Sequence, residues 1–265
     1  MVDNAAFPGL SSQEQKRYRR QIVIPGMGDE GQQKLKKSRV MIVGLGGLGS
    51  PVALYLAAAG VGHLSLVEGD CIEESNLQRQ ILYTTGDIGK LKAECAARHL
   101  QSLNPCIEID SYPQRLTESN ASSLIVGHDL VLSCVDNRAT RQLLNSVCYS
   151  LNIPWIDAGV VRAIGTVMTF LPHRGPCYAC LHNEPTEDES DLPLSPASLG
   201  VWGAAAGAIG SLQAMEAINF LLEREEHPVG RMLWVDMQEM ICEAIFIQPS
   251  DDCPVCGQKG RDFHN

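Results

Sequence analysis

The chain has 265 residues, a formal net charge of −10 and a sequence pI near 5.1. This length is enough for one large α/β domain with a substantial buried core. The acidic balance excludes the basic footprint of a protein that binds nucleic acid or an anionic membrane surface, so we expect small molecules or proteins as ligands.

The N-terminus, M-V-D-N-A-A-F-P-G-L, lacks the basic region and the long apolar core of a secretory signal, so we expect a cytoplasmic protein. The first predicted element is a short, highly charged helix over residues 11–21, which begins with a capping box between Ser11 and Glu14. We expect this basic helix to lie outside the core.

The next part of the chain alternates apolar strands with helices. Strands are predicted at residues 39–43, 63–67, 107–111, 128–133 and 153–157. The helices between them include one capped by Asp87, with apolar residues at helical spacing, and one at residues 138–151. The alternation predicts a parallel, doubly wound, Rossmann-like α/β sheet.

After Gly165 the pattern changes to the strands T-V-M-T-F-L, R-M-L-W-V-D and C-E-A-I-F-I with one helix from about residue 203 to 222, which predicts antiparallel additions to the sheet. The uncharged stretch 192–215 is long enough to span a bilayer, but its prolines, glycines and serines favour a loop that leads into a core helix. We see no linker and expect one domain over residues 1–265, with an acidic mobile loop at about 183–199.

The strand at residues 39–43 runs into a glycine-rich turn, G-L-G-G-L-G, that contains Gly44, Gly46, Gly47 and Gly49. This spacing is typical of loops that bring backbone N–H groups against a nucleotide phosphate at a helix N-terminus. Close packing of a strand on a helix is the alternative.

Acidic and cationic residues follow the second strand. Glu68 and Asp70 lie about 20 residues beyond the glycines, which fits a ligand of a ribose hydroxyl. The segment S-N-L-Q-R-Q then places Asn76, Arg79 and Gln80 beside the expected phosphate site, where a guanidinium and amides suit phosphate charge. An ion pair on a surface loop is the alternative.

Two further groups are predicted near the same sheet edge. Lys92 lies at a helix start, where it can reach a phosphate, although a solvated helix face is the alternative. Asp136 and Asn137 follow the fourth strand, where ligands of open α/β sheets bind. Asp136 can hold Mg²⁺ through oxygen, or it can be an ordinary helix N-cap.

The strongest single signal is a pair of C-x-x-C knuckles, formed by Cys177 with Cys180 and by Cys253 with Cys256. Two such pairs can close a tetrahedral thiolate site around Zn²⁺, and four thiolates leave no open coordination position. Disulfides are disfavoured in a cytosolic chain. The sequence therefore predicts a structural zinc site.

In this order the motifs R-Y-x-R-Q, G-L-G-G-L-G, S-N-L-Q-R-Q, G-x-x-K, C-x-D-N and the two knuckles resemble the ThiF/MoeB/HesA family of ubiquitin-activating-like adenylyltransferases, over about residues 11–258. The resemblance implies an enzyme that binds ATP with Mg²⁺ and adenylates the C-terminal glycine of a small ubiquitin-like sulfur-carrier protein. Residues 11–160 would then bind the nucleotide, and residues 161–258 would bind the carrier and the zinc.

The resemblance also implies roles for individual residues. The glycines would cradle the nucleotide, Glu68 or Asp70 would meet the ribose, and Asp136 would assist the metal and the α-phosphate. Phosphates would be handled by Asn76, Arg79 and Lys92. Family dimers imply that Arg20 acts in the neighbouring active site, similarly to an arginine finger.

Two features bear on the later sulfur chemistry. The family's cysteine before the second glycine-rich helix is missing, because Pro196 lies near that position and no cysteine occurs between Cys180 and Cys242. We therefore expect an enzyme that stops at the acyl-adenylate, since the thiolate nucleophile is missing. No rhodanese-like domain follows the second knuckle, so we expect an external sulfur donor such as a cysteine desulfurase or a rhodanese.

The carrier implied by the resemblance ends in Gly-Gly and is MoaD-like or ThiS-like, with the molybdopterin branch favoured over thiamin. Two other functions stay open from the residues. An NAD-dependent oxidoreductase with structural zinc would explain the glycines, the acid and the knuckles but not S-N-L-Q-R-Q or Lys92. A non-catalytic binder of ubiquitin-like proteins would not need the cations.

Overall fold

The computed structural model describes residues 9–181, 199–222 and 227–257. One eight-stranded sheet with the order β3-β2-β1-β4-β5-β6-β7-β8 runs through these residues. The parallel strands are β1 (Arg39–Val43), β2 (His63–Val67), β3 (Glu108–Tyr112), β4 (Leu130–Ser133) and β5 (Trp155–Val161). The antiparallel strands are β6 (Ile164–Phe170), β7 (Arg231–Asp236) and β8 (Ile241–Phe246). The predicted change from parallel to antiparallel pairing is confirmed.

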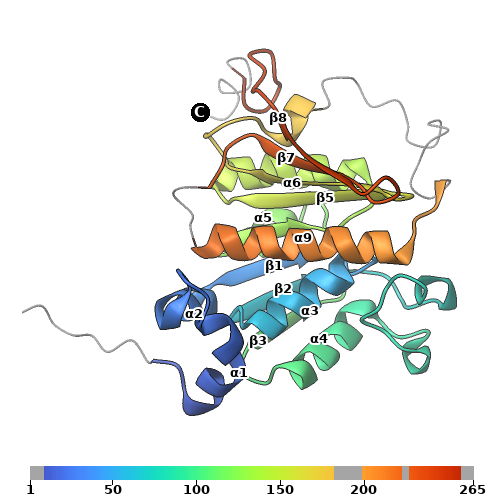
Figure 1. The fold of residues 1–265 in the computed structure, drawn as a ribbon. Coiled ribbons are helices and arrows are strands. Elements are labelled where there is room, and N and C mark those ends of the chain that lie inside the picture. The colour runs from blue at the N-terminus through green and yellow to red at the C-terminus, as the bar shows by residue number, and fades with distance from the viewer. Residues whose placement is uncertain (1–8, 182–198, 223–226, 258–265) are drawn as a thin grey trace, which may run out of the picture.

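Helices cover both faces of the sheet (Figure 1). One face carries α3 (Gly49–Ala59), α4 (Lys92–Leu103) and α9 (Gly203–Leu222). The other face carries α5 (Ala121–Ile125) and α6 (Arg138–Leu151), and the short α7 (Tyr178–Leu181) packs against α6. Two helices near the N-terminus, α1 (Ser12–Ile22) and α2 (Gly28–Lys37), pack at one end of the sheet.

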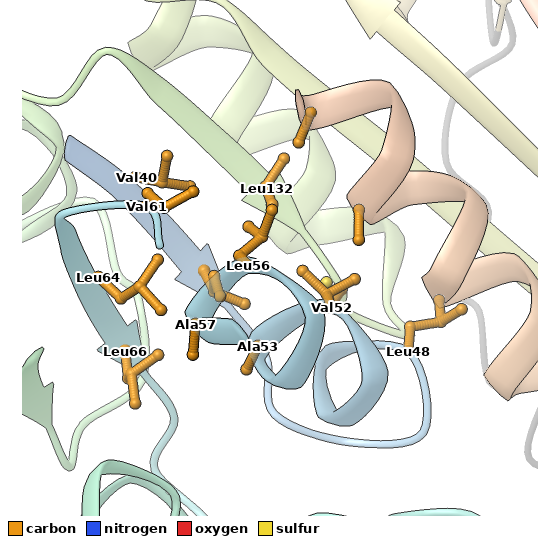
Figure 2. Close-up of a cluster of buried hydrophobic side chains, with 14 of the residues drawn as sticks. Val40, Leu48, Val52, Ala53, Leu56, Ala57, Val61, Leu64, Leu66 and Leu132 are labelled. Carbon is orange, nitrogen blue, oxygen red and sulfur yellow. The ribbon is translucent and has the colours of Figure 1, made fainter. Parts of the chain in front are cut away.

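The core between the sheet and the first helical layer is built from aliphatic side chains (Figure 2). Val52 and Leu56 of α3 face Leu64 of β2 and Leu132 of β4, and all four are fully buried. Burying a side chain of this size stabilises the fold by about 2 kcal/mol. The apolar pattern that predicted these strands is therefore the pattern that holds α3 against the sheet.

Helix α9 is long and apolar enough, by length and composition, to cross a membrane. Half of its most apolar window is buried, and the helix packs beside α3 and against β5 and β6. Gly210 brings the α9 backbone against the Leu48 carbonyl and Pro51, a position where a Cβ atom would clash. The helix over residues 203–222 is thus the expected core helix.

The start of α4 differs from the prediction. Asp87 does not cap this helix but closes a short 3₁₀ turn, η2 (Thr85–Asp87), and α4 begins at Lys92 with Leu91 in the N-cap position. The Asp87 carboxylate accepts hydrogen bonds from the Thr84 N–H at 3.1 Å and the Thr84 hydroxyl at 2.8 Å. An extra turn therefore separates Asp87 from α4, and Lys92 is the first residue of α4.

The N-terminal helices also differ from the prediction. Helix α1 has the predicted Ser11–Glu14 capping box, but it is not outside the core. Tyr18 is 3% exposed, and its hydroxyl accepts a hydrogen bond from the Asn104 side chain at 2.8 Å. Helix α2 and the short α5 were not predicted, because α2 has only one large apolar residue, Leu35, and α5 is only five residues long.

Candidate functional site

A large cleft of about 1240 Å³ lies at the carboxyl ends of the parallel strands. Strands β2, β1 and β4 are neighbours there, so the loops that follow them meet at one sheet edge. The cleft brings together most of the residues selected from the sequence, namely Gly44, Gly46, Gly47, Glu68, Asp70, Arg79, Gln80, Lys92, Asp136 and Asn137.

The glycine-rich turn has the conformation that its sequence requires. Gly44 has φ +90°, and a Cβ atom there would lie 2.7 Å from the Cys134 carbonyl oxygen. A Cβ atom on Gly49 would clash with the Gly44 carbonyl, because the turn closes on itself before α3. Gly46 and Gly47 line the cleft, whereas Gly49 supports the turn from outside the lining.

The two acids after β2 have different partners. Glu68 accepts hydrogen bonds from the N–H groups of Leu45 at 3.1 Å and Asp70 at 3.0 Å, so it is tied to the glycine turn. Asp70 forms ion pairs with Arg115 at 2.9 Å and with Lys92 at 3.6 Å. The Asp70 carboxylate is therefore compensated by two cations, and that of Glu68 is held by backbone amides.

Two cations chosen from the sequence reach the cleft in different environments. The Lys92 side chain is only 7% exposed, so its ammonium group is held beside Asp70 rather than in solvent. Arg79 is partly exposed and donates a hydrogen bond to the Ser75 carbonyl at 3.1 Å. The solvated-face alternative for Lys92 is wrong, because a solvated lysine would not be buried.

The amides of S-N-L-Q-R-Q divide between structure and cleft. Asn76 does not line the cleft; its side-chain oxygen accepts from the Glu73 N–H at 3.2 Å and supports the turn. Gln80 does line it, is 4% exposed, and has a side-chain oxygen with no hydrogen-bond partner among the described residues. A buried acceptor without a donor costs free energy, so Gln80 fits a group that a ligand would complete.

The turn after β4 presents one carboxylate. Asn137, not Asp136, caps α6 by accepting from the Thr140 N–H at 2.9 Å. Asp136 is exposed and makes no hydrogen bond or ion pair with the part of the chain that the structure describes. Cys134 lies beneath this turn, and burial raises the pKa of its thiol, so it is a poor thiolate nucleophile.

Sequence reasoning missed three arginines that line the cleft, Arg115, Arg141 and Arg162. Arg115 follows β3 and lies beside Asp70 because β3 pairs with β2. The rule that selected Asp136, a polar residue just past a parallel strand, also applies to Arg115. Arg141 lies inside a helix and Arg162 in the β5–β6 hairpin, where no motif marks them.

Arg20 is not part of this cleft within one chain. It is exposed on α1, which packs near Ala59 and Asn104, at the far ends of α3 and α4 from the glycine turn. Any role of Arg20 at an active site therefore requires a second copy of the chain.

The four knuckle cysteines come together in a separate cluster. Their sulfur atoms all lie within 4.8 Å of one another, with Cys177 to Cys253 at 3.5 Å and Cys180 to Cys256 at 3.3 Å. A tetrahedral zinc ion with Zn–S bonds of about 2.3 Å separates its sulfurs by roughly 3.8 Å, so the cluster fits such an ion. All ten cysteines are free of disulfides.

Polar groups around the cluster suit bound thiolates. The Asn145 amide donates to the Cys177 sulfur at 3.6 Å, and the Ser250 N–H donates to the Cys180 sulfur at 3.5 Å. Burial raises the pKa of the Cys177 thiol to about 12, and a coordinated metal overrides this because it deprotonates its thiol ligands. The cluster is compatible with zinc.

Comparisons with known proteins agree with this geometry. The family model described as "ThiF family" matches residues 18–255. The chain is 41% identical to the protein named SAMP-activating enzyme E1 of Haloferax volcanii, over 96% of this chain and 93% of that protein. It is also 41% identical to the protein named sulfur carrier protein ThiS adenylyltransferase of Escherichia coli, over 96% of this chain and 99% of that protein.

Two further likenesses extend the comparison. The molybdopterin-synthase adenylyltransferase of Salmonella typhimurium is 41% identical over 94% of this chain and 99% of its own length. A crystal structure of E. coli MccB with AMPCPP and MccA superposes with a TM-score of 0.81 at 26% identity, covering 94% of this chain and 76% of that one. Matches of this extent, together with the cleft and the cysteine cluster, show that the chain belongs to the ThiF family.

Proposed function

We propose that this chain uses ATP to adenylate the C-terminal glycine carboxylate of a small ubiquitin-like sulfur-carrier protein. A carboxylate oxygen forms a bond to the α-phosphorus, the bond from that phosphorus to the α–β bridging oxygen breaks, and pyrophosphate leaves. The observation that carries this proposal is that Arg79, the buried Lys92 and Asp136, which has no partner among the described residues, lie in one cleft with the glycine turn. Relatives at about 40% identity are named adenylyltransferases of sulfur carriers.

The reaction needs charge compensation rather than a proton-transfer base, because an anionic carboxylate attacks an anionic phosphate. Arg79 and Lys92 stabilise the charge on the phosphates, and Gly46 and Gly47 let the backbone approach them. We assign the ribose to Glu68, since the carboxylate of Asp70 is already paired with Arg115 and Lys92. Gln80 and Asn137 complete the nucleotide site in this proposal, and Asn76 supports it from behind.

Asp136 fits a ligand of Mg²⁺, because it is an exposed carboxylate at the cleft with no competing cation bonded to it among the described residues. When bound, Mg²⁺ would neutralise phosphate charge and help to orient the α-phosphate. The four-cysteine cluster would hold Zn²⁺ in a structural role, since all four positions of a tetrahedral ion are taken by protein sulfurs.

The partners follow from the same proposal. The carrier ends in Gly-Gly and is MoaD-like or ThiS-like, with molybdopterin synthesis favoured over thiamin synthesis. An external sulfur donor, such as a cysteine desulfurase or a rhodanese, then acts on the acyl-adenylate in the cytoplasm. The loop at about 183–199, which carries Pro196 where the family has cysteine, lies outside the described residues except for Leu199.

A homodimer would allow Arg20 to act on the neighbouring cleft. Inactive Arg20→Ala and Asp136→Asn proteins, mixed under conditions of subunit exchange, should then recover activity, because one of the two clefts in a mixed dimer has both groups. Recovery that never exceeds the sum of the separate proteins would contradict the assignment of Arg20 in trans.

The proposed activity is tested by ATP–pyrophosphate exchange with Mg²⁺ and purified carriers that end in Gly-Gly. We expect exchange only when a carrier is present, and a loss of roughly 100-fold or more in Arg79→Ala. Truncating the terminal glycine of the carrier is the matched control and should abolish exchange. Binding of NADH without any carrier-dependent exchange would favour the oxidoreductase instead.

A further inference from the structure

A buried ion pair lies directly beneath the turn that presents Asp136. The Arg141 Nε atom of α6 lies 3.0 Å from the Asp157 Oδ1 atom of β5, and the two side chains are only 15% and 13% exposed. The Ser133 hydroxyl donates to the same carboxylate oxygen at 2.7 Å. Burial is the largest single influence on Arg141 and lowers its pKa, but the pKa of the guanidinium is raised overall, because Asp157, Tyr178 and Asp136 together outweigh burial.

The same guanidinium is hydrogen-bonded to two backbone segments that line the cleft, the turn after β4 and strand β5. Its Nη2 atom donates to the Val135 carbonyl at 2.8 Å and to the Ala158 carbonyl at 3.1 Å. Val135 lies just after β4, immediately before Asp136 in the chain, and Ala158 lies within β5. Arg141 therefore fixes the peptide from which the Asp136 side chain projects.

Every neighbour of Asp136 in this turn is anchored. Ser133 is held by Asp157, Val135 by Arg141, and Asn137 by the Thr140 N–H at 2.9 Å. Asp136 alone presents its carboxylate to the cleft with no bond to the described residues. Such a pattern restricts the backbone while it leaves one side chain available to a ligand.

We propose that Arg141, held by Asp157, is a positioning residue that sets the Asp136 carboxylate for its metal and phosphate role. This inference rests on the proposed function, because it assigns to Asp136 the role given there. Arg141 itself need not touch the nucleotide; its effect passes through the Val135 peptide.

Stability alone does not account for this pair. A buried ion pair costs desolvation energy and is often no more stabilising than well-packed apolar residues of similar volume. The planar guanidinium, in contrast, makes three bonds in fixed directions, to Asp157, Val135 and Ala158. A lysine at the same position keeps the charge but cannot reproduce this fork.

The decisive variant is Arg141→Lys, compared with Asp136→Asn and with the double variant. Mn²⁺ affinity of the protein–AMPCPP complex is measured by electron paramagnetic resonance, and kcat and KM by pyrophosphate exchange. We expect Arg141→Lys to weaken Mn²⁺ binding and to lower kcat by roughly 10- to 100-fold, as a supporting partner of a metal ligand does. The double variant should lose little beyond Asp136→Asn, because both changes act on the same carboxylate.

Leu144→Ala is the matched control, since Leu144 is fully buried on the same helix within the apolar cluster. It should lower the melting temperature at least as much as Arg141→Lys does, with unchanged Mn²⁺ affinity. Wild-type Mn²⁺ affinity in Arg141→Lys, or equal weakening in Leu144→Ala, would overturn the inference. Absence of carrier-dependent exchange in the wild-type protein would instead overturn the proposed function, while the Mn²⁺ titration would still decide the role of Arg141.

Discussion

At the scale of single residues, Lys92 and Lys90 are close in sequence, but only Lys92 lines the cleft. Lys92 is buried beside Asp70 and lines the cleft. Lys90 is half exposed, bonds to the Gly86 carbonyl at 2.7 Å and does not line the cleft. The two positions differ in environment but carry the same chemical group.

This difference predicts that Lys92→Ala lowers kcat/KM for ATP by roughly 100- to 1000-fold, because it removes a positive charge from the phosphates in a site of low exposure. Lys90→Ala should leave kcat/KM within about threefold of wild type, since its ammonium pairs with Asp87 and the Gly86 carbonyl outside the cleft. Steady-state exchange kinetics of both variants provide the measurement. Equal losses in the two variants would contradict a direct role for Lys92.

The cleft residues that could be predicted belong to short sequence motifs, whereas those that were missed reach the cleft only through tertiary packing. Glu68, Arg79 and Asp136 follow strands within short motifs, so the chain itself marks them. Arg115 reaches the cleft only because β3 pairs with β2, and Arg141 only because α6 turns one face toward the β4 and β5 ends. Strand order and helix rotation are properties of tertiary packing and are not encoded in local spacing.

At the scale of elements, the two knuckles join segments that are far apart in the chain. Cys177 and Cys180 lie around α7, whereas Cys253 and Cys256 lie beyond β8. The cluster also contacts α6 through Asn145, whose side chain accepts from the Tyr178 N–H at 2.9 Å. A metal at this cluster would therefore fix the C-terminal segment to the helix that carries Arg141.

We expect the purified protein to contain one zinc ion per chain and Cys256→Ala to lose it, with a fall of several degrees in melting temperature, because metal binding contributes directly to folding. Cys242→Ala is the matched control, since Cys242 is exposed on β8 and outside the cluster. Plasma emission analysis and thermal unfolding give the two readouts. Full zinc content in Cys256→Ala would show that this cysteine is not a ligand.

The turn before α4, which contains Asp87, should make the stability of the fold depend on pH. The pKa of Asp87 lies well below its usual range, mainly because the carboxylate accepts hydrogen bonds from Thr84. The Lys90 ammonium lowers this pKa further. A lowered pKa in the folded protein means that the ionised carboxylate stabilises the fold above the unfolded-state pKa of about 3.9. That contribution is lost as the pH falls toward the lower pKa of the folded protein.

Asp87→Asn should therefore reduce the free energy of unfolding by about 2 kcal/mol at pH 6, and the difference from wild type should shrink as the pH falls below about 4. Urea unfolding at pH 6, 4 and 3 measures this. Asp29→Asn is the control, because Asp29 is exposed on α2, and it should reduce the free energy of unfolding at pH 6 by less than Asp87→Asn does. A difference that grows on acidification would contradict the sign of the pKa shift.

Prediction of the elements themselves was most accurate where the apolar period is strong. The ranges 39–43, 63–67, 138–151 and 203–222 agree with the structure, because each segment is buried along a regular face. Helix α2 was missed because its only buried side chains are Gln32 and Leu35, and Asp87 was misplaced because a turn can use the same capping chemistry as a helix.

At the scale of the whole molecule, one sheet joins the glycine turn to the segment that carries the second knuckle. The parallel strands bring the charged groups to one edge, and the antiparallel strands extend the sheet beyond β5. The alternation of strands and helices predicted the parallel part of this sheet, and the change of pattern after Gly165 predicted its antiparallel part. The choice of carrier depends on surface contacts, which no motif in the chain describes.

The central claim is that the cleft transfers AMP to a carrier carboxylate, and intact-mass spectrometry tests it most directly. The protein is incubated with ATP, Mg²⁺ and a Gly-Gly carrier, without a sulfur donor. We predict a carrier that has gained the mass of one AMP, with an equal amount of pyrophosphate and no covalent adduct between enzyme and carrier. A carrier of unchanged mass with every Gly-Gly protein tested, although ATP is bound, would contradict the account.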